Sequence, residues 1–249
     1  MPAQTLSSPN FWPAAIKDSI GTQTRIGSSS GTIHAETACI MTASQPTRGA
    51  HIFSTDPSCP NCMKNMVEAG IRHLYIDHKG FEKYYAKTRM TDFETLTLAI
   101  CKANGVGVTT IFRKEKRTEE ILPETTARHT KDTKHSSQNY ASAQTKNGQT
   151  LTVYDGPVSG FKTMPAQTST KYNSAMQPLT RLLMHIARGG ITIDPASITS
   201  SRVPTSRELT NFIGAGYSAL TIIDQTNARD DAAFEALKLL TQHNVLKVN

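Results

Sequence analysis

Residues 34–62 read HAETACIMTASQPTRGAHIFSTDPSCPNC, and the interpretation of the whole chain depends on this stretch. HAETACIMTA (34–43) has small and apolar residues at helical spacing, which predicts a helix. HIFSTD (51–56) has the composition of a strand. CPNCMKNMVEAG (59–70) predicts a second helix that ends at Gly70, because glycine readily adopts the left-handed conformation of a helix cap. The stretch is therefore predicted to be a helix–strand–helix unit.

The residues that follow continue this alternation. HLYID (73–77) predicts a strand, DFETLTLAICKAN (92–104) a helix and VGVTTIF (106–112) a strand. Alternating helices and strands are typical of an α/β protein, and the helical crossover predicts that the last two strands are parallel. Residues 113–150 begin with RKEKRTEE and hold few apolar residues, so we expect a linker or a long surface loop there.

The second half of the chain repeats the order of the first. MVEAGIRHLYID (66–77) is similar to FIGAGYSALTIID (212–224), since each leads through Ala-Gly into an apolar strand that ends in Asp. Gly70 and Gly216 lie 146 positions apart (216 − 70). We therefore expect a duplicated α/β fold. The alternative is that α/β units resemble one another through shared patterning alone.

Three residues of the first half have the side chains and spacing of a zinc site. His34, Cys59 and Cys62 supply one imidazole and two thiolates, and a catalytic zinc keeps three protein ligands and one open position. The cysteines begin a helix, where partial positive charge favours the thiolate. No further His or Cys stands at a spacing typical of a fourth zinc ligand, which predicts a site with one open coordination position. Glu36 is then placed to move a proton between an activated water and a leaving amine.

The spacing of H-A-E and C-P-N-C resembles the cytidine and deoxycytidylate deaminase superfamily. The resemblance covers roughly residues 33–112, and CPNCMKNMVEAGI is most similar to deoxycytidylate deaminases and tRNA adenosine deaminases. It implies a three-layer α-β-α cytidine-deaminase-like fold and one zinc ion per chain. It also implies that His34, Cys59 and Cys62 are the zinc ligands and that Glu36 is the general acid and base.

The chain departs from the pattern of that superfamily in two places. Ser58 stands where a proline usually precedes the first cysteine, and Pro57 lies one position earlier. Only 33 residues precede His34, and they show little strand pattern. Superfamily members have a helix and a two-stranded hairpin there, and the hairpin supplies an Asn to the substrate pocket. The sequence assigns no residue of this chain to the role of that Asn, so it does not identify the nucleobase of the substrate.

The second half has no counterpart of the ligands. In the alignment set by the repeat, Met176, Gln177 and Pro178 stand in place of His-Ala-Glu, and Thr205 and Glu208 stand in place of the two cysteines. We therefore expect a catalytic zinc deaminase domain at 1–125, a polar basic linker at 126–150 and a degenerate, non-catalytic deaminase-like domain at 151–249. Because superfamily members pair through these helices, the resemblance implies either a homodimer or intramolecular pairing of the two halves.

Three functions remain open at this point. The resemblance favours a zinc-dependent deaminase of a cytosine nucleotide such as deoxycytidylate. A deaminase that acts on cytosine or adenine in RNA or single-stranded DNA is slightly favoured by the formal net charge of +7 and the basic stretch after residue 112. In a non-enzymatic, zinc-stabilised interaction module, Glu36 would have no role.

Cysteine usage and hydropathy suggest where the protein resides. The first thirty residues lack a secretory pattern, and no run of about 18 apolar residues exists, so we expect a cytoplasmic protein with no membrane span. Reduced thiols in a cytoplasmic protein favour metal binding by the close cysteine pair. Cys39 and Cys101 lie on apolar helix faces, where we expect free thiols.

Overall fold

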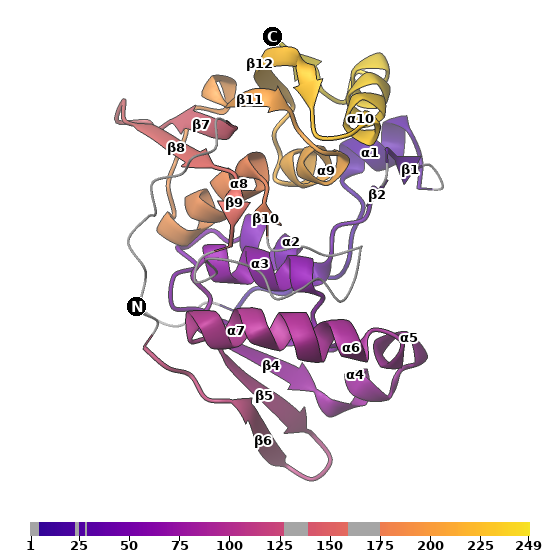
Figure 1. Cartoon of the computed structure of the whole chain (residues 1–249), viewed down its shortest axis with the longest axis vertical. Coiled ribbons are helices and arrows are strands. Elements are labelled where there is room, and N and C mark those ends of the chain that lie inside the picture. The colour runs from indigo at the N-terminus through magenta and orange to yellow at the C-terminus, as the bar shows by residue number, and fades with distance from the viewer. Residues whose placement is uncertain (1–4, 23–24, 28, 127–138, 159–174) are drawn as a thin grey trace. The chain divides into compact units, whose positions relative to one another are not determined.

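The computed structural model describes residues 5–22, 25–27, 29–126, 139–158 and 175–249 (Figure 1). The chain divides into two compact units. Unit 1 contains the described residues of Met1–Pro46, His135–Gly156 and Gln177–Asn249, and unit 2 contains those of Thr47–Lys134 and Pro157–Met176. Both units combine helices with a sheet, which confirms the predicted α/β class.

Unit 2 follows the predicted alternation. Its elements are β3 (His51–Ser54), α3 (Pro60–Glu68), β4 (His73–Asp77), α4 (His78–Glu82), α5 (Tyr84–Lys87), α6 (Met90–Asp92), the π-helical turn η1 (Phe93–Thr97), α7 (Leu98–Asn104), β5 (Gly107–Phe112) and β6 (Arg117–Leu122). The sheet has the order β3-β4-β5-β6; the first three strands are parallel and β6 is antiparallel to β5. The predicted parallel pairing of 73–77 with the strand near 106–112 is confirmed.

Helix α3 illustrates how the sequence sets the local structure of unit 2. Pro60 is its first residue, where the missing N–H costs no hydrogen bond. Met63 and Met66 are fully buried, and α3 packs against α7. The turn after the helix uses Gly70, whose φ of 78° is easily reached only by glycine. The predicted end of this helix at Gly70 therefore agrees with the observed turn.

Unit 1 contains elements from both ends of the chain. They are α1 (Ala14–Ser19), β1 (Arg25–Ile26), β2 (Ser29–Ser30), α2 (Ala35–Met41), β7 (Tyr140–Gln144), β8 (Thr150–Tyr154), α8 (Pro178–Gly189), the 3-10 turn η2 (Pro195–Ser197), β11 (Thr199–Val203), α9 (Ser206–Gly214), β12 (Ala219–Ala228), α10 (Asp231–Gln242) and β13 (Lys247–Val248). The main sheet has the order β13-β12-β11-β7-β8. Strands β11, β12 and β13 are parallel, and the β7–β8 hairpin joins β11 in antiparallel orientation.

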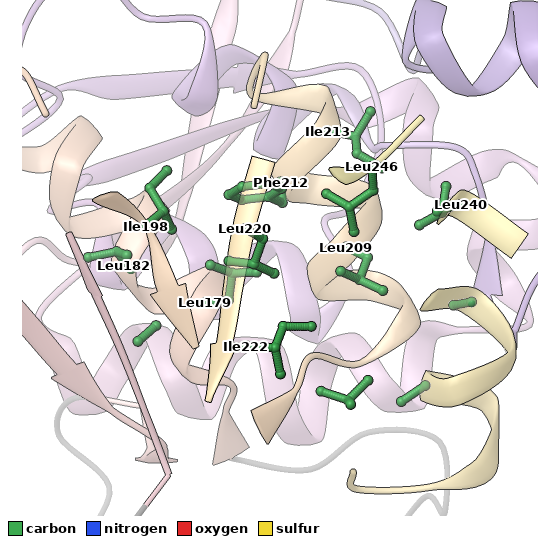
Figure 2. Close-up of a cluster of buried hydrophobic side chains, with 14 of the residues drawn as sticks. Leu179, Leu182, Ile198, Leu209, Phe212, Ile213, Leu220, Ile222, Leu240 and Leu246 are labelled. Carbon is green, nitrogen blue, oxygen red and sulfur yellow. The ribbon is translucent and has the colours of Figure 1, made fainter. Parts of the chain in front are cut away.

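The core of unit 1 lies between this sheet and its helices. Figure 2 shows ten of its side chains with labels: Leu179, Leu182, Ile198, Leu209, Phe212, Ile213, Leu220, Ile222, Leu240 and Leu246. Ile16 of α1 belongs to the same buried cluster, and Trp12 packs against it. The segment around Trp12 therefore contributes to a core built mainly from the second half of the chain.

The expectation of a loop or linker over 113–150 is wrong at two places. Residues 117–122 form β6, an edge strand with four exposed residues, and charged side chains are common on such edges. The Arg117 guanidinium lies 3.6 Å from the ring centroid of Phe112 on the neighbouring strand. Residues 140–144 form β7, whose inward side chains, Ala141 and Ala143, are too small to give a clear hydrophobic signal. Residues 127–138 of the expected linker lie outside the described residues.

Two further short strands, β9 (Gly156–Pro157) and β10 (Ala175–Met176), pair with each other. Within the described ranges, none of the helices combines the length and the apolar character needed to cross a membrane.

Candidate metal centre

His34, Cys59 and Cys62 present their donor atoms within 4.8 Å of one another. Cys62 is buried, while His34 and Cys59 are half-buried. A zinc ion with bonds of roughly 2.0–2.3 Å holds such donors about 3.3–3.8 Å apart, so small side-chain rotations would allow all three donors to bind one ion. One imidazole and two thiols are a donor set that zinc accepts. The group could therefore hold a metal ion and is compatible with zinc.

The start of α3 sets the positions of the two cysteines. Cys59 is the N-cap residue, and its sulfur accepts a hydrogen bond from the backbone N–H of Cys62 at 3.5 Å. The preceding residue, Ser58, is buried, and its carbonyl accepts a hydrogen bond from the Thr97 hydroxyl at 3.2 Å. Both sulfurs thus lie at the positive end of a helix dipole, which favours thiolates.

The start of α2 positions His34 and Glu36. His34 is the N-cap residue with extended backbone angles, and its side chain makes no capping hydrogen bond. Glu36 lies in the first turn and is half-buried. The backbone N–H of Ala35, between them, donates to the side-chain oxygen of Asn10 at 2.8 Å. The backbone pairing of Phe11 with Ile33 holds the Asn10 segment beside this helix start.

Asn10 was missed by sequence reasoning, although the helix start contains an indirect signal. A helix begins with N–H groups that need acceptors, and His is a poor N-cap residue. An imidazole reserved for a metal cannot satisfy them, so an outside acceptor is required. Nothing in the spacing identifies that acceptor, because Asn10 lies 25 positions before Ala35.

The other two cysteines have environments unlike that of the metal group. Cys101 is fully buried and its thiol donates to the Met63 sulfur at 3.4 Å. Burial raises the pKa of the Cys101 thiol to about 12, so it stays protonated at neutral pH. Burial also raises the pKa of Cys39, and the nearby Glu36 carboxylate adds to this effect. Neither Cys39 nor Cys101 forms a disulfide, which agrees with the prediction of free thiols.

Two histidines near the cysteine pair in sequence have other partners. His73 bonds the Thr109 hydroxyl at 2.8 Å and lies 3.6 Å from the Glu124 carboxylate. Burial lowers the pKa of His73. The ring of His51 lies 5.7 Å from that of His73 on the neighbouring strand. In the described part of the chain, no second set of three His, Cys, Asp or Glu side chains lies close enough to hold a metal ion.

Comparison with known proteins gives one weak similarity. The chain is 33% identical over 66 residues to a protein of Aliivibrio fischeri named "Uncharacterized deaminase in luxG 3'region". The match covers 26% of this chain and 45% of that protein, so the chain spans less than half the length of this relative. No protein-family model matches the chain. No solved structure matches it either.

Proposed function

We propose that the protein is a zinc-dependent hydrolytic deaminase of a nucleobase, with cytosine in a nucleotide such as deoxycytidylate as its substrate. The observation that carries the proposal is the grouping of the His34, Cys59 and Cys62 donor atoms within 4.8 Å of one another, with Glu36 in the first turn of the helix that begins after His34. The similarity of part of the chain to a protein named as a deaminase supports the same class of activity.

In this proposal, His34, Cys59 and Cys62 hold the zinc ion. When bound, zinc would supply Lewis acidity that makes a water molecule nucleophilic at neutral pH. The hydrogen bond from Cys62 N–H to the Cys59 sulfur and the Ala35–Asn10 bond fix the two helix starts that carry the ligands. Such fixed geometry keeps the ligand set in place without reorganisation during turnover.

Glu36 carries protons in this reaction. Its carboxylate accepts a proton from the attacking water while the new C–O bond forms at the ring carbon that bears the amine. It delivers that proton to the adjacent ring nitrogen. Glu36 then carries the second proton of the water to the amine. The C–N bond breaks, and the electron pair of that bond leaves with ammonia. The products are a keto base and ammonia, and Glu36 returns to its starting state.

We further propose that the chain is a duplicated cytidine-deaminase-like fold with a non-catalytic second copy. Helices α3 and α9 begin 146 positions apart (206 − 60) and end 146 positions apart (214 − 68). The turns after them use Gly70 and Gly216, with φ of 78° and 90°. The strands that flank and follow these helices also pair alike. In unit 2, β3, β4 and β5 are parallel, and in unit 1, β11, β12 and β13 are parallel. These matches are more specific than shared α/β patterning.

The helix starts favour a correction to the sequence alignment. The N-cap of α2 is His34 and the N-cap of α8 is Gln177. Gln177 therefore takes the place of His34, one position away from the Met176 expected from the sequence. Within unit 1, α2 contacts α8. This contact supports the proposal that the second copy serves as an internal partner for the first, in place of a second subunit.

A base within RNA or single-stranded DNA is the second candidate substrate. One observation favours it: the exposed ring of Phe53 stacks on Tyr75 across β3 and β4, with centroids 4.6 Å apart. Aromatic side chains on a sheet are a common platform for unpaired bases, and the net charge of +7 suits a phosphate backbone.

The test is a substrate panel with zinc-quantified protein: deoxycytidylate, cytidine, deoxycytidine, adenosine, and RNA and single-stranded DNA containing cytosine or adenine. Ammonia release and base conversion are measured for the parent, for Glu36→Gln and for Glu94→Gln, an exposed control. We expect conversion of a cytosine nucleotide that disappears only in Glu36→Gln. Conversion of RNA or single-stranded DNA alone would favour the second candidate, a base within a polynucleotide. No conversion of any substrate, with zinc bound, would favour a structural zinc and overturn the proposal.

A further inference from the structure

The second half of the chain contains a cluster of polar side chains, half-buried to buried, at the positions that the proposed duplication aligns with the metal group. Helices α8 and α9 begin after Gln177 and Thr205, and Glu208 follows in the first turn of α9. By the N-cap correspondence and the offset of 146 (205 − 59 and 208 − 62), these three residues replace the imidazole and the two thiols. Gln177, Thr205 and Glu208 therefore retain none of the three metal ligands.

The Arg202 guanidinium lies within this cluster. The Arg202 guanidinium donates to the side-chain oxygen of Gln177 at 2.6 Å and to the carbonyl of Val203 at 2.9 Å, and it lies 4.0 Å from a carboxylate oxygen of Glu208. Arg202 is 3% exposed and Glu208 is 1% exposed. A buried arginine without partners is very costly, and it stays charged in proteins. The cluster is therefore organised around a permanent positive charge.

Glu208 joins the two helix starts. One carboxylate oxygen accepts from the backbone N–H of Leu179 in α8 at 2.8 Å. The other accepts from the backbone N–H and the hydroxyl of Thr205, at 2.8 Å and 3.0 Å. The carboxylate thus links α8 to α9 through direct hydrogen bonds. In the first copy, a metal ion bound by His34 on α2 and by the α3 cysteines would make the corresponding link.

The strand that carries Arg202 is irregular at this residue. The pairing of β11 with β12 shifts register between Arg202 and Val203, whereas β3 pairs with β4 without a shift. A bulge of this kind redirects a side chain. The irregularity therefore occurs at the residue that introduces the cation into the cluster.

We propose that this cluster is a former metal centre in which the Arg202 guanidinium has taken the place of the metal cation. The inference rests on the duplicated fold proposed above. Two thiolates and a divalent cation are neutral together, as are one carboxylate and one guanidinium. The replacement therefore preserves the charge balance while it exchanges metal bonds for hydrogen bonds. It follows that the second half binds no metal while Arg202 is present.

The test restores the ligands in the full chain. The variant Gln177→His/Thr205→Cys/Glu208→Cys is made with Arg202 retained and with Arg202→Ala. Bound metal is counted by native mass spectrometry, and the absorption spectrum is recorded with Co²⁺. We expect about one additional metal equivalent only in the variant with Arg202→Ala, together with a thiolate-to-cobalt charge-transfer band. The readout is the increase over the parent, so it does not depend on whether the parent binds metal or deaminates any substrate.

Folding is measured in the same samples, because these variants remove buried hydrogen bonds. Thermal unfolding of the Arg202→Ala variant should shift to higher temperature on addition of Zn²⁺, since a metal that binds the native state stabilises it. The same addition should not stabilise the variant that retains Arg202. Equal metal uptake with and without Arg202 would contradict the proposal. So would the absence of any uptake by the Arg202→Ala variant, whether that variant is folded or remains unfolded with metal.

Discussion

The two pairs of helix starts, α2 with α3 and α8 with α9, carry different chemistry, although α3 and α9 have the same length and each pair is joined through a strand. In the first pair, His34, Cys59 and Cys62 bring three donor atoms within 4.8 Å of one another. In the second pair, the buried Glu208 carboxylate accepts hydrogen bonds from both helix starts and lies 4.0 Å from the buried Arg202 guanidinium. The difference teaches what the proposals above require: a metal ion would join the first pair, a guanidinium lies within the second, and Glu36 belongs to the pair that is compatible with a metal.

The largest effect is expected for Glu36→Gln, which keeps the shape of the side chain and removes its ability to accept a proton. Turnover should fall by at least about 10²–10⁴-fold, the contribution typical of positioned acid–base groups. Metal content and melting temperature should stay unchanged. Steady-state kinetics with the identified substrate checks this. Near-normal turnover in Glu36→Gln would contradict the proposed proton transfer by Glu36, and with it the proposed catalytic difference between the two pairs of helix starts.

The next effect is expected for Arg202→Met. The change leaves Glu208 buried without its cation and Gln177 without its donor, and loss of one member of a buried pair costs roughly 3–5 kcal/mol. Urea unfolding checks the prediction. Lys83→Met is the matched control, because the ion pair of Lys83 with Asp56 is partly exposed and is worth at most about 1 kcal/mol. Equal destabilisation by the two changes would contradict the role assigned to Arg202.

A smaller effect is expected for Asn10→Ala. It removes the acceptor of the Ala35 N–H and should lower stability by about 0.5–2 kcal/mol, the usual cost of losing a helix cap. Asn10→Asp keeps an acceptor oxygen next to the helix start and should retain most of this stability. Thermal unfolding of the three proteins side by side measures the difference. Loss of stability in Asn10→Asp equal to that in Asn10→Ala would argue against capping as the role of Asn10.

The smallest effect near neutral pH is expected at Cys101. The unfolded thiol ionises near pH 9.0, whereas burial raises the pKa of the folded thiol to about 12. Its contribution to stability is therefore fully present below pH 9 and is lost as the pH rises from about 9 towards 12. At pH 8 an alkylating reagent should modify Cys101 only after unfolding, which peptide mass mapping can check. Rapid modification of Cys101 in the folded protein would contradict its burial.

The sequence predicted much of the regular structure and proposed the ligand set, because both depend on short-range patterns. Helix α3 and the parallel pairing of β4 with β5 follow from hydrophobic periodicity and a crossover of suitable length. Strand β6 was missed because exposed, charged residues dominate it. Asn10 and the Arg202–Gln177 contact were missed because both join residues 25 positions apart through tertiary packing, which no local pattern encodes.

The contrast between the two pairs of helix starts is tested most directly by the metal content of the purified protein. After dialysis against metal-free buffer, inductively coupled plasma mass spectrometry should give about one zinc per chain. Cys62→Ser should lose this zinc, and Glu208→Gln, the corresponding change in the second half, should retain it. A parent protein without bound metal, or zinc that persists in Cys62→Ser and disappears in Glu208→Gln, would contradict the assignment of the metal to the first half.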